Sequence, residues 1–250
     1  MGRLDGKIAL VTGASRGIGR AIALRLAADG ARIGVHYATA RGAAEETLAA
    51  IREAGGEGFA LSADLSSLSG VEQLADQLRT ALDDRPLDIL INNAGVGASG
   101  TIADTDEASF DRLFMVDVKA PFFVTQRVLP LLADGGRIVN ISSVVSMAAY
   151  PTTIAYAAAK AALNSMTVSL AAGLGPRGIT VNAVAPGATA TDFLGPMLDD
   201  PAVVDMLEGA TVFGRLGKPE DIVGLVAFLA GPEAAWVTGQ IIAASGGMHL

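Results

Sequence analysis

The stretch KIALVTGASRGIG, residues 7–19, joins a short apolar run to a glycine-rich turn and to the start of a helix. The run 7–12 has the pattern of a buried strand, and Gly13, Gly17 and Gly19 follow it directly. Glycine permits a tight turn at Gly13, lets the backbone approach a ligand at Gly17 and allows close helix packing at Gly19. The free N–H groups of a helix N-terminus attract an anion. The stretch therefore predicts the first strand, loop and helix of a nucleotide-binding α/β fold.

The same alternation of strand and helix continues along the chain. Short β-branched runs alternate with alanine-rich stretches that have helical periodicity. The expected strands are 7–12, 31–37, 58–64, 87–93, 137–142, 179–185 and 240–245. The expected helices are 17–28, 45–55, 71–82, 107–133, 154–174 and 219–230. Because parallel strands need a crossover to return each strand, this order predicts a doubly wound (Rossmann) α/β sheet of about seven parallel strands in a single domain, 1–250.

One segment, 188–217, interrupts the alternation. It is long, punctuated by glycine and proline, and only weakly helical. Insertions of this kind often carry binding residues over a rigid scaffold, so we expect a substrate lid here.

The composition of the 250 residues limits the kind of protein. Hydrophobic residues make up 51% and charged residues 18%, which is enough apolar material for a sizeable core. The net charge is -8, without a basic cluster, so nucleic acid is not an expected partner. The chain has no cysteine, and His36 and His249 are isolated, so no metal site is expected. The N-terminus lacks a secretory signal and no apolar run approaches the ~20 residues that span a bilayer, which favours a cytoplasmic protein without a membrane partner.

The end of the second expected strand bears on the choice of coenzyme. Rossmann sites that bind NAD usually carry Asp or Glu about 20 residues after the glycine loop, where the carboxylate binds the ribose hydroxyls. This chain has Tyr37 there, followed by Thr39 and Arg41, with Arg16 in the glycine loop. Without a carboxylate to repel a 2′-phosphate, these residues favour NADP(H) and leave NAD(H) open. The alternative interpretation is that both arginines are ordinary solvated charges.

Tyr156 and Lys160 stand in the alanine-rich stretch IAYAAAKAAL, residues 154–163. A separation of four residues places both side chains on one face of a helix, and the alanines between them leave space beside that face. An ammonium group one turn away stabilises phenolate and is expected to lower the pKa of the tyrosine hydroxyl. The pair indicates a helix face with room for a ligand to approach; the plainer alternative is an amphipathic helix with a solvated lysine.

Several separated motifs occur in the order typical of short-chain dehydrogenases/reductases, a family that the chain resembles over nearly its whole length. They are TGASRGIG (12–19), ADL (63–65), NNAG (92–95), Ser143, YAAAK (156–160), PGATAT (186–191) and GRLGKPEDI (214–222). Within the family, the sequence is similar to β-ketoacyl-carrier-protein reductases and to trihydroxynaphthalene-type polyketide ketoreductases. The resemblance implies an NAD(P)-dependent enzyme that reduces a carbonyl group to a secondary alcohol by hydride transfer.

The resemblance also assigns roles to individual residues. It makes Tyr156 the proton donor to the carbonyl oxygen, Ser143 the hydroxyl that holds this oxygen, and Lys160 the group that holds the nicotinamide ribose. The implied coenzyme contacts are Gly13, Ser15, Arg16, Gly17, Ile18, Gly19, Tyr37, Thr39, Asp64, Leu65, Asn92, Ala94, Gly95, Tyr156, Lys160, Pro186, Gly187, Thr189 and Thr191. Without the family, the aspartate of ADL would be interpreted as a turn or helix cap, and Ser143 as an ordinary strand-end hydroxyl.

Asp117 is a further candidate catalytic residue, and it departs from the family pattern. In FDRLFMVDVKAPFF (110–123) it occupies the place of an active-site asparagine, which in similar enzymes holds a water that relays protons from the lysine. Two placements stay open. Asp117 either turns to solvent or a nearby surface cation, or it lies beside Lys160, where its charge opposes formation of phenolate at Tyr156.

The expected substrate pocket is apolar. Its candidate walls come from the segment after NNAG, the segment between Ser143 and Tyr156, and the lid: Val96, Gly97, Val145, Met147, Tyr150, Phe193, Met197, Met206 and Leu207. Such walls favour a lipophilic or aromatic ketone, or the corresponding alcohol, over a sugar. The plainer alternative is that the Met and Phe side chains belong to an ordinary core. Two other functions stay open: an NADP-dependent alcohol or sugar dehydrogenase that works in the oxidative direction, and a catalytically weakened NADP-binding regulatory protein.

The expected helices 107–133 and 154–174 are apolar over most of their circumference, which predicts burial on more than one side. Similar proteins pair these helices, so the resemblance implies a homotetramer, with a dimer as the alternative.

Overall fold

Seven short runs of mostly buried residues pair side by side in the computed structural model, which describes residues 2–248. The strands are β1 Ile8–Val11, β2 Arg32–Tyr37, β3 Gly58–Ser62, β4 Leu87–Asn92, β5 Leu132–Ile141, β6 Thr180–Pro186 and β7 Ile241–Ala244. Their order in the sheet is β3-β2-β1-β4-β5-β6-β7, and every neighbouring pair is parallel. The predicted doubly wound parallel sheet is therefore confirmed.

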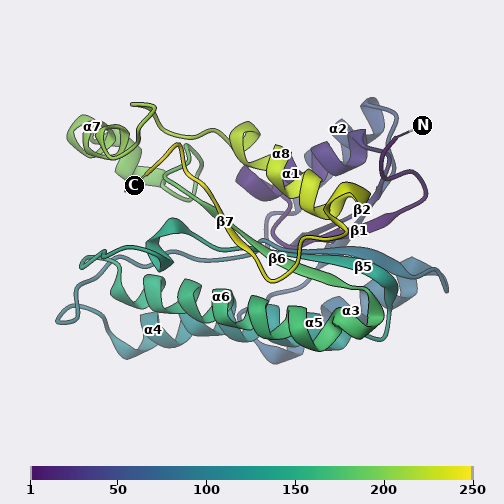
Figure 1. Ribbon diagram of the computed structural model, residues 1–250. Helices are drawn as coiled ribbons and strands as arrows, with labels where there is room; N and C mark the ends of the chain where they lie inside the picture. Colours follow the sequence, from purple (N-terminus) through teal and green to yellow (C-terminus); the bar gives the residue numbers. More distant parts are fainter. Residues whose placement is uncertain (1, 249–250) are drawn as a thin grey trace.

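Helices cover both faces of this sheet (Figure 1). The helices are α1 Gly17–Ala28, α2 Arg41–Glu53, α3 Leu68–Leu82, α4 Glu107–Phe114, α5 Ala120–Val128, α6 Ile154–Leu174, α7 Pro201–Gly209 and α8 Pro219–Ala230. Figure 1 shows α1, α2 and α8 on one face and α3, α4, α5 and α6 on the other. Successive strand residues point to opposite faces, so Val11 packs in the core under α1 and α8, whereas Leu10 packs in the core under α3 and α5.

The prediction of one helix over 107–133 is wrong in its middle and at its end. A π-helical turn, Met115–Lys119, separates α4 from α5, and the N–H of Ala120 bonds to the carbonyl of Met115. Pro121 has no N–H to donate to the carbonyl of residue 117, so regular α-helical bonding cannot continue through this point. The second helix ends at Val128, and β5 begins at Leu132 rather than at residue 137.

The order of the strands reverses at β1, because β2 and β3 lie on one side of it and β4 to β7 lie on the other. Open α/β sheets bind ligands at such a reversal, beyond the carboxyl ends of the strands. The two loops that meet at this point are joined directly: the side-chain amide of Asn93 donates to the carbonyls of Thr12 and Gly13, at 2.9 and 3.2 Å. The fold thus brings the glycine loop against the segment that follows β4.

The segment 188–217 holds a short 3₁₀ turn, Gly195–Asp199, and helix α7, whose N-terminus is capped by Asp200. Figure 1 shows α7 away from the sheet. None of the residues of α7 is buried. The segment contacts the rest of the fold through a small buried cluster, in which Leu207 and Ala210 pack against Val144, Ala185 and Met248.

Candidate active site

The glycine loop follows β1 and opens α1 at Gly17. The φ angles of Gly13 and Gly17 are 66° and 55°, in the left-handed region that favours glycine. A Cβ on Gly19 would overlap the carbonyl of Gly13, so close packing excludes a side chain there. Among the described residues, no side chain caps the first turn of α1 and no acidic residue lies in it. Its N–H groups are available to an anion, and the cradle fits the pyrophosphate of a dinucleotide.

Ser15 and Ile18 lie on the protein side of this loop. Ser15 is buried, and its carbonyl accepts a hydrogen bond from the hydroxyl of Thr47 at 3.4 Å. Ile18 packs against the core under α1. Both residues therefore anchor the loop through burial.

His36 holds the loop in place, a role that no pattern in the sequence indicated. Its Nδ1 accepts a hydrogen bond from the N–H of Gly13 at 3.0 Å, so Nε2 carries the proton that faces the carbonyl of Ala63, also at 3.0 Å. Burial lowers the pKa of His36 to about 4, which keeps the ring neutral at neutral pH. A lone histidine in a strand is usually a core residue, and only the fold shows that this one touches the loop.

The residues predicted near a 2′-phosphate lie at the ends of β2 and of the glycine loop. Tyr37 ends β2, and Thr39 is exposed just beyond it. Arg41 is exposed, and its Nε donates to Glu45 at 2.7 Å. The guanidinium of Arg16 is 70% exposed and lies 3.9 Å from Asp192. These cations are held only by exposed pairs, which cost little to rearrange.

Asp64 and Leu65 follow β3. The carboxylate of Asp64 accepts a hydrogen bond from the N–H of Ser66 at 2.9 Å, which lowers the pKa of Asp64. This hydrogen bond forms the turn that an aspartate at this position predicts without the family, and the side chain of Asp64 remains exposed. Leu65 is buried at 5% exposure and packs in the core under α3.

Asn92, the first residue of NNAG, uses its side chain inside the protein and not toward a coenzyme ribose. The side-chain amide of Asn92 is buried and donates to Thr125 and Asn140, at 3.2 and 2.8 Å. This side chain links β4 to β5 and α5, so a ribose contact by Asn92 is open only to its main chain. Ala94 and Gly95 are partly exposed beyond the strand end.

The predicted nicotinamide clamp follows β6. Pro186 ends the strand, and Gly187 lies so close to Ser245 that a Cβ would be 2.9 Å from its Cα. Thr189 is buried and its hydroxyl donates to the carbonyl of Gly187 at 2.9 Å, whereas Thr191 is partly exposed. A Cβ on Gly17 would lie 3.6 Å from the side chain of Thr191, so the clamp segment approaches the glycine loop.

Ser143, Tyr156 and Lys160 meet beyond the carboxyl end of β5. Tyr156 stands in the first turn of α6, and the Nζ of Lys160, one turn later, lies 5.6 Å from the centre of its ring. Lys160 is buried and donates to the carbonyl of Ile141 at 3.1 Å. The hydroxyl of Ser143 interacts with the phenol of Tyr156 and favours its ionised form. The structure thus brings the serine that the resemblance indicated next to the tyrosine and the lysine, which the four-residue spacing places on one helix face.

A small network supports Ser143 from behind. The hydroxyl of Ser146 donates to the carbonyl of Ser143 at 2.6 Å, and the amide of Asn164 donates to Ser146 at 2.8 Å. Asn164 stands on α6 one turn beyond Lys160, so a single helix positions three groups around the site. The sequence pattern did not identify Asn164, because nothing in its spacing separates it from other polar residues of the helix.

The structure places Asp117 beside Lys160 and not in solvent. Its Oδ1 lies 2.9 Å from Nζ of Lys160, and the two side chains are 0% and 5% exposed. Its Oδ2 accepts a hydrogen bond from the N–H of Val96 at 2.9 Å. A Cβ on Gly95 would lie 2.8 Å from Oδ1 and 3.4 Å from Nζ, so this glycine covers the ion pair closely. Of the two placements that the sequence left open, the buried one is correct.

The pKa of Tyr156 is raised, contrary to the simple expectation from its lysine neighbour. Burial is the largest cause; Lys160 lowers the pKa, the carboxylate of Asp117 raises it, and the hydroxyl of Ser143 lowers it. For Lys160, burial is the largest single cause and opposes the charged form, but the charges of Asp117 and Tyr156 and the hydrogen bond to Asp117 together raise the pKa of the ammonium group. The lysine therefore stays charged, while the tyrosine stays protonated at neutral pH.

Phe193, from the segment 188–217, lies over this group. Its ring centre is 5.9 Å from that of Tyr156, and a Cβ on Gly97 would lie 3.0 Å from the tip of the Phe193 ring. Phe193, Met197 and Met206 are 52%, 43% and 61% exposed, and Met147 is 54% exposed. Phe193 thus covers the phenol without being buried in a core, and the three methionines are likewise exposed.

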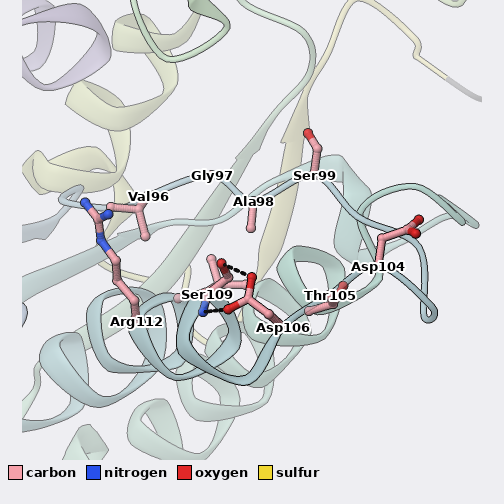
Figure 2. Close-up of a pocket in the computed structure, with 10 residues that line it drawn as sticks. Val96, Gly97, Ala98, Ser99, Asp104, Thr105, Asp106, Ser109 and Arg112 are labelled. Carbon is pink, nitrogen blue, oxygen red and sulfur yellow. Dashed lines mark hydrogen bonds between the residues drawn. The ribbon is translucent and has the colours of Figure 1, made fainter.

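A cavity of about 240 Å³ lies between the segment that follows β4 and the start of α4 (Figure 2). Its lining residues are Val96, Gly97, Ala98, Ser99, Asp104, Thr105, Asp106, Ser109, Arg112 and Leu113. Figure 2 shows the hydrogen bonds with which Asp106 caps α4 through Ser109. The cavity shares Val96 and Gly97 with the predicted pocket walls, but Ser143, Tyr156 and Lys160 do not line it.

Within residues 2–248, no helix combines the length and the apolarity that crossing a membrane requires. The same residues contain no group of three or more His, Cys, Asp or Glu side chains arranged to hold a metal ion. His249 lies outside the described residues.

Comparison with known proteins agrees with this geometry. A family model described as enoyl-(acyl carrier protein) reductase matches residues 13–249. The versicolorin reductase stcU of Emericella nidulans is 38% identical, covering 98% of this chain and 96% of its own. A short-chain type dehydrogenase/reductase of Picea abies is 41% identical over 98% of this chain and 93% of its own. The chain belongs to the short-chain dehydrogenase/reductase family.

Solved structures are similar over the whole fold. The angucycline C-6 ketoreductase LanV, crystallised with NADP, is 44% identical with a TM-score of 0.95, over 99% of this chain and 97% of its own. The promiscuous reductase LugOII, which reduces a ketone at C1 during lugdunomycin biosynthesis, is 44% identical with a TM-score of 0.94, over 99% and 100%.

Proposed function

We propose that this protein is an NADPH-dependent oxidoreductase that reduces a ketone, or a 3-oxoacyl group, to a secondary alcohol. The observation that carries the proposal is the meeting of Ser143, Tyr156 and Lys160 at the carboxyl end of β5, with the ammonium group 5.6 Å from the ring of Tyr156. The similar structures include ketoreductases, one of them with bound NADP. A protonated phenol beside a hydroxyl and a fixed cation is suited to donate a proton to a carbonyl oxygen.

Each side chain has a separate task in this mechanism. A nicotinamide coenzyme, when bound, would supply the hydride for reduction of the carbonyl group. Ser143 holds the carbonyl oxygen, and the phenol of Tyr156 gives it a proton. Lys160 would hold the nicotinamide ribose, and it stabilises the phenolate that remains, because a cation near a phenolate lowers its free energy. Asn164 and Ser146 keep Ser143 in position through its main chain.

The coenzyme site extends from the glycine loop to the clamp. The residues proposed to hold the coenzyme are Gly13, Ser15, Arg16, Gly17, Ile18, Gly19, Tyr37, Thr39, Asp64, Leu65, Asn92 through its main chain, Ala94, Gly95, Tyr156, Lys160, Pro186, Gly187, Thr189 and Thr191. Tyr37 stands where a carboxylate would repel a 2′-phosphate, and the guanidinium of Arg16 is free enough to turn toward one. These features favour NADPH over NADH.

We further propose that the segment 188–217 is a lid over an apolar substrate. Phe193 lies over Tyr156, and Met197 and Met206 of the same segment are exposed, which suits a lipophilic or aromatic ketone better than a sugar. Relatives named as a versicolorin reductase and as a probable tetrahydroxynaphthalene reductase support an aromatic substrate.

We also propose that the chain forms a homotetramer in the cytoplasm. Phe110 and Phe122, on α4 and α5, are 40% and 47% exposed, and Val168 on α6 is 49% exposed. These apolar side chains lie on the helices for which the sequence predicted a second contact. Light scattering at micromolar concentration tests this: a tetramer or dimer is expected, and a monomer would contradict it.

The activity is tested by following NADPH oxidation with a panel of bicyclic and tricyclic aromatic ketones, 3-oxoacyl thioesters and sugars. We expect the aromatic ketones to be reduced faster than the sugars, and Tyr156→Phe to reduce the rate at least about 100-fold. Turnover of sugars alone would contradict the pocket, and saturable NADPH binding without turnover in either direction would indicate a binding protein instead.

A further inference from the structure

Asp117 is a fully buried acid held next to the groups that move the proton. The π-helical turn Met115–Lys119 directs its side chain inward, where the N–H of Val96 and the ammonium of Lys160 hold its two oxygens, each at 2.9 Å. Gly95 closes over Oδ1, since a Cβ there would lie 2.8 Å away. The carboxylate therefore has a fixed position and cannot turn to solvent.

Few other charges act at this point. Among the described residues, the charged groups that act on the phenol of Tyr156 are Lys160, on the same helix, and Asp117, on the π-helical turn. The neighbours from the other packed elements are neutral: Leu113, Phe114 and Val118, Val96, Phe193 and the hydroxyl of Ser143. The ammonium favours phenolate, and the carboxylate 2.9 Å from it cancels part of that effect.

We propose that Asp117 is a positioning residue that sets the pH range of the reaction: its charge, acting through Lys160 and on the phenol, keeps Tyr156 protonated to higher pH. The inference rests on the proposed function. In reduction, the O–H bond of Tyr156 breaks as hydride reaches the carbonyl carbon; the proton goes to the oxygen, and solvent returns a proton to the phenolate. Oxidation needs phenolate as the acceptor. Asp117 therefore extends reduction toward alkaline pH and delays oxidation.

The first test measures the tyrosine itself. The near-ultraviolet absorbance of tyrosinate is followed against pH in the full chain, without coenzyme and with saturating NADP⁺. Subtracting the titration of the Tyr156→Phe variant in each background isolates Tyr156 from the other two tyrosines. In Asp117→Asn, we expect the midpoint to move to lower pH by on the order of one pH unit, the size expected when a nearby like charge is removed. An unchanged or higher midpoint would overturn the inference.

Asp111→Asn is the matched control. It removes the same charge from an exposed position on α4 and should leave the midpoint of Tyr156 unchanged. If Asp117→Asn does not fold, Asp117→Ser provides a second neutral side chain, whose hydroxyl can accept the hydrogen bond from Val96. An equal change of midpoint in the Asp111 variant would assign the effect to net charge and overturn the role of Asp117.

The second test uses kcat/KM against pH at saturating coenzyme, for ketone reduction and for alcohol oxidation. Both profiles should move to lower pH in Asp117→Asn, so that oxidation near neutral pH becomes about tenfold faster if the midpoint falls by one pH unit. A lower maximum of kcat/KM, with the midpoints of both pH profiles unchanged, would indicate a structural role only and contradict the inference. If no ketone and no alcohol reacts, the proposed function fails, while the titration of Tyr156 still decides the electrostatic inference.

Discussion

Replacing Lys160 by methionine should destabilise the protein through the carboxylate that it leaves behind. Lys160 and Asp117 form a buried ion pair at 2.9 Å, with side chains 5% and 0% exposed. Methionine fills most of the volume of the lysine stem but carries no charge. Asp117 would then keep one neutral partner, the N–H of Val96, for a buried negative charge.

The distance sets the size of the effect. For unit charges 2.9 Å apart and an effective dielectric constant of about 20, Coulomb's law gives an attraction of about 6 kcal/mol. Part of this loss is offset, because the variant no longer has to remove an ammonium group from water on folding. Breaking a buried pair from one side typically costs about 3–5 kcal/mol, and we expect Lys160→Met to lower the free energy of unfolding by that amount at neutral pH.

The loss should depend on pH. The orphaned carboxylate can take up a proton in the folded state at a pH where the same group in the unfolded chain is ionised. The folded variant then binds more protons than the unfolded chain, so its stability is greatest in acid and falls as pH rises, by about 1.4 kcal/mol per pH unit for one proton. The destabilisation should therefore shrink on going from pH 8 to pH 5.

Urea denaturation followed by circular dichroism, at several pH values, measures these free energies. The control is the double variant Lys160→Met/Asp117→Asn, in which both partners are neutral and nearly isosteric, and which should recover most of the loss. A single variant that loses less than about 1 kcal/mol at neutral pH would contradict the reasoning, as that value is typical of an exposed pair. A loss that the second substitution does not recover would assign the effect to packing.

Three other predictions concern the coenzyme site. Gly19→Ala should weaken NADPH binding by on the order of 100-fold in a fluorescence titration, because its Cβ overlaps the loop, whereas Gly42→Ala, with open space around it, should not. Arg16→Ala should raise KM for NADPH about tenfold and leave KM for NADH unchanged, and Arg20→Ala is the matched control. Burial lowers the pKa of His36 from 6.5 to about 4, so the neutral ring contributes its full stability above pH 6.5 and loses that contribution as pH falls toward 4. Urea denaturation should show that the free energy of unfolding falls by about 3 kcal/mol by pH 4, and that the fall is smaller in His36→Asn.

Local patterns predicted the fold because each element carries its own signal. A strand buried on both faces is a short apolar run in the sequence, and the glycine loop marks the point where the order of the strands reverses. The one clear error, the helix over 107–133, arose because apolar periodicity continues through a break in hydrogen bonding. Pro121 was the available sign of that break, since it cannot donate to a carbonyl four residues earlier.

The site was predictable where function depends on spacing and not where it depends on packing. Tyr156 and Lys160 share a helix, so a separation of four residues already places them together. His36 and Asn164 act through contacts made by distant segments, the glycine loop and the turn after β5, and no local pattern reports such contacts. The direction of Asp117 was open for the same reason, because the π-helical turn decides it.

Stability alone does not account for the buried pair of Asp117 and Lys160. Replacing such a pair by apolar side chains is often neutral or stabilising, because both charges must leave water. Lys160 is needed as a cation near the phenol, yet burial disfavours that charge, and the carboxylate of Asp117 makes the largest of the contributions that oppose burial. The same carboxylate raises the pKa of Tyr156 and so opposes the phenolate that the lysine favours. A site built this way holds a permanent cation beside a tyrosine that stays protonated, and that combination suits proton donation to a ketone more than proton removal from an alcohol.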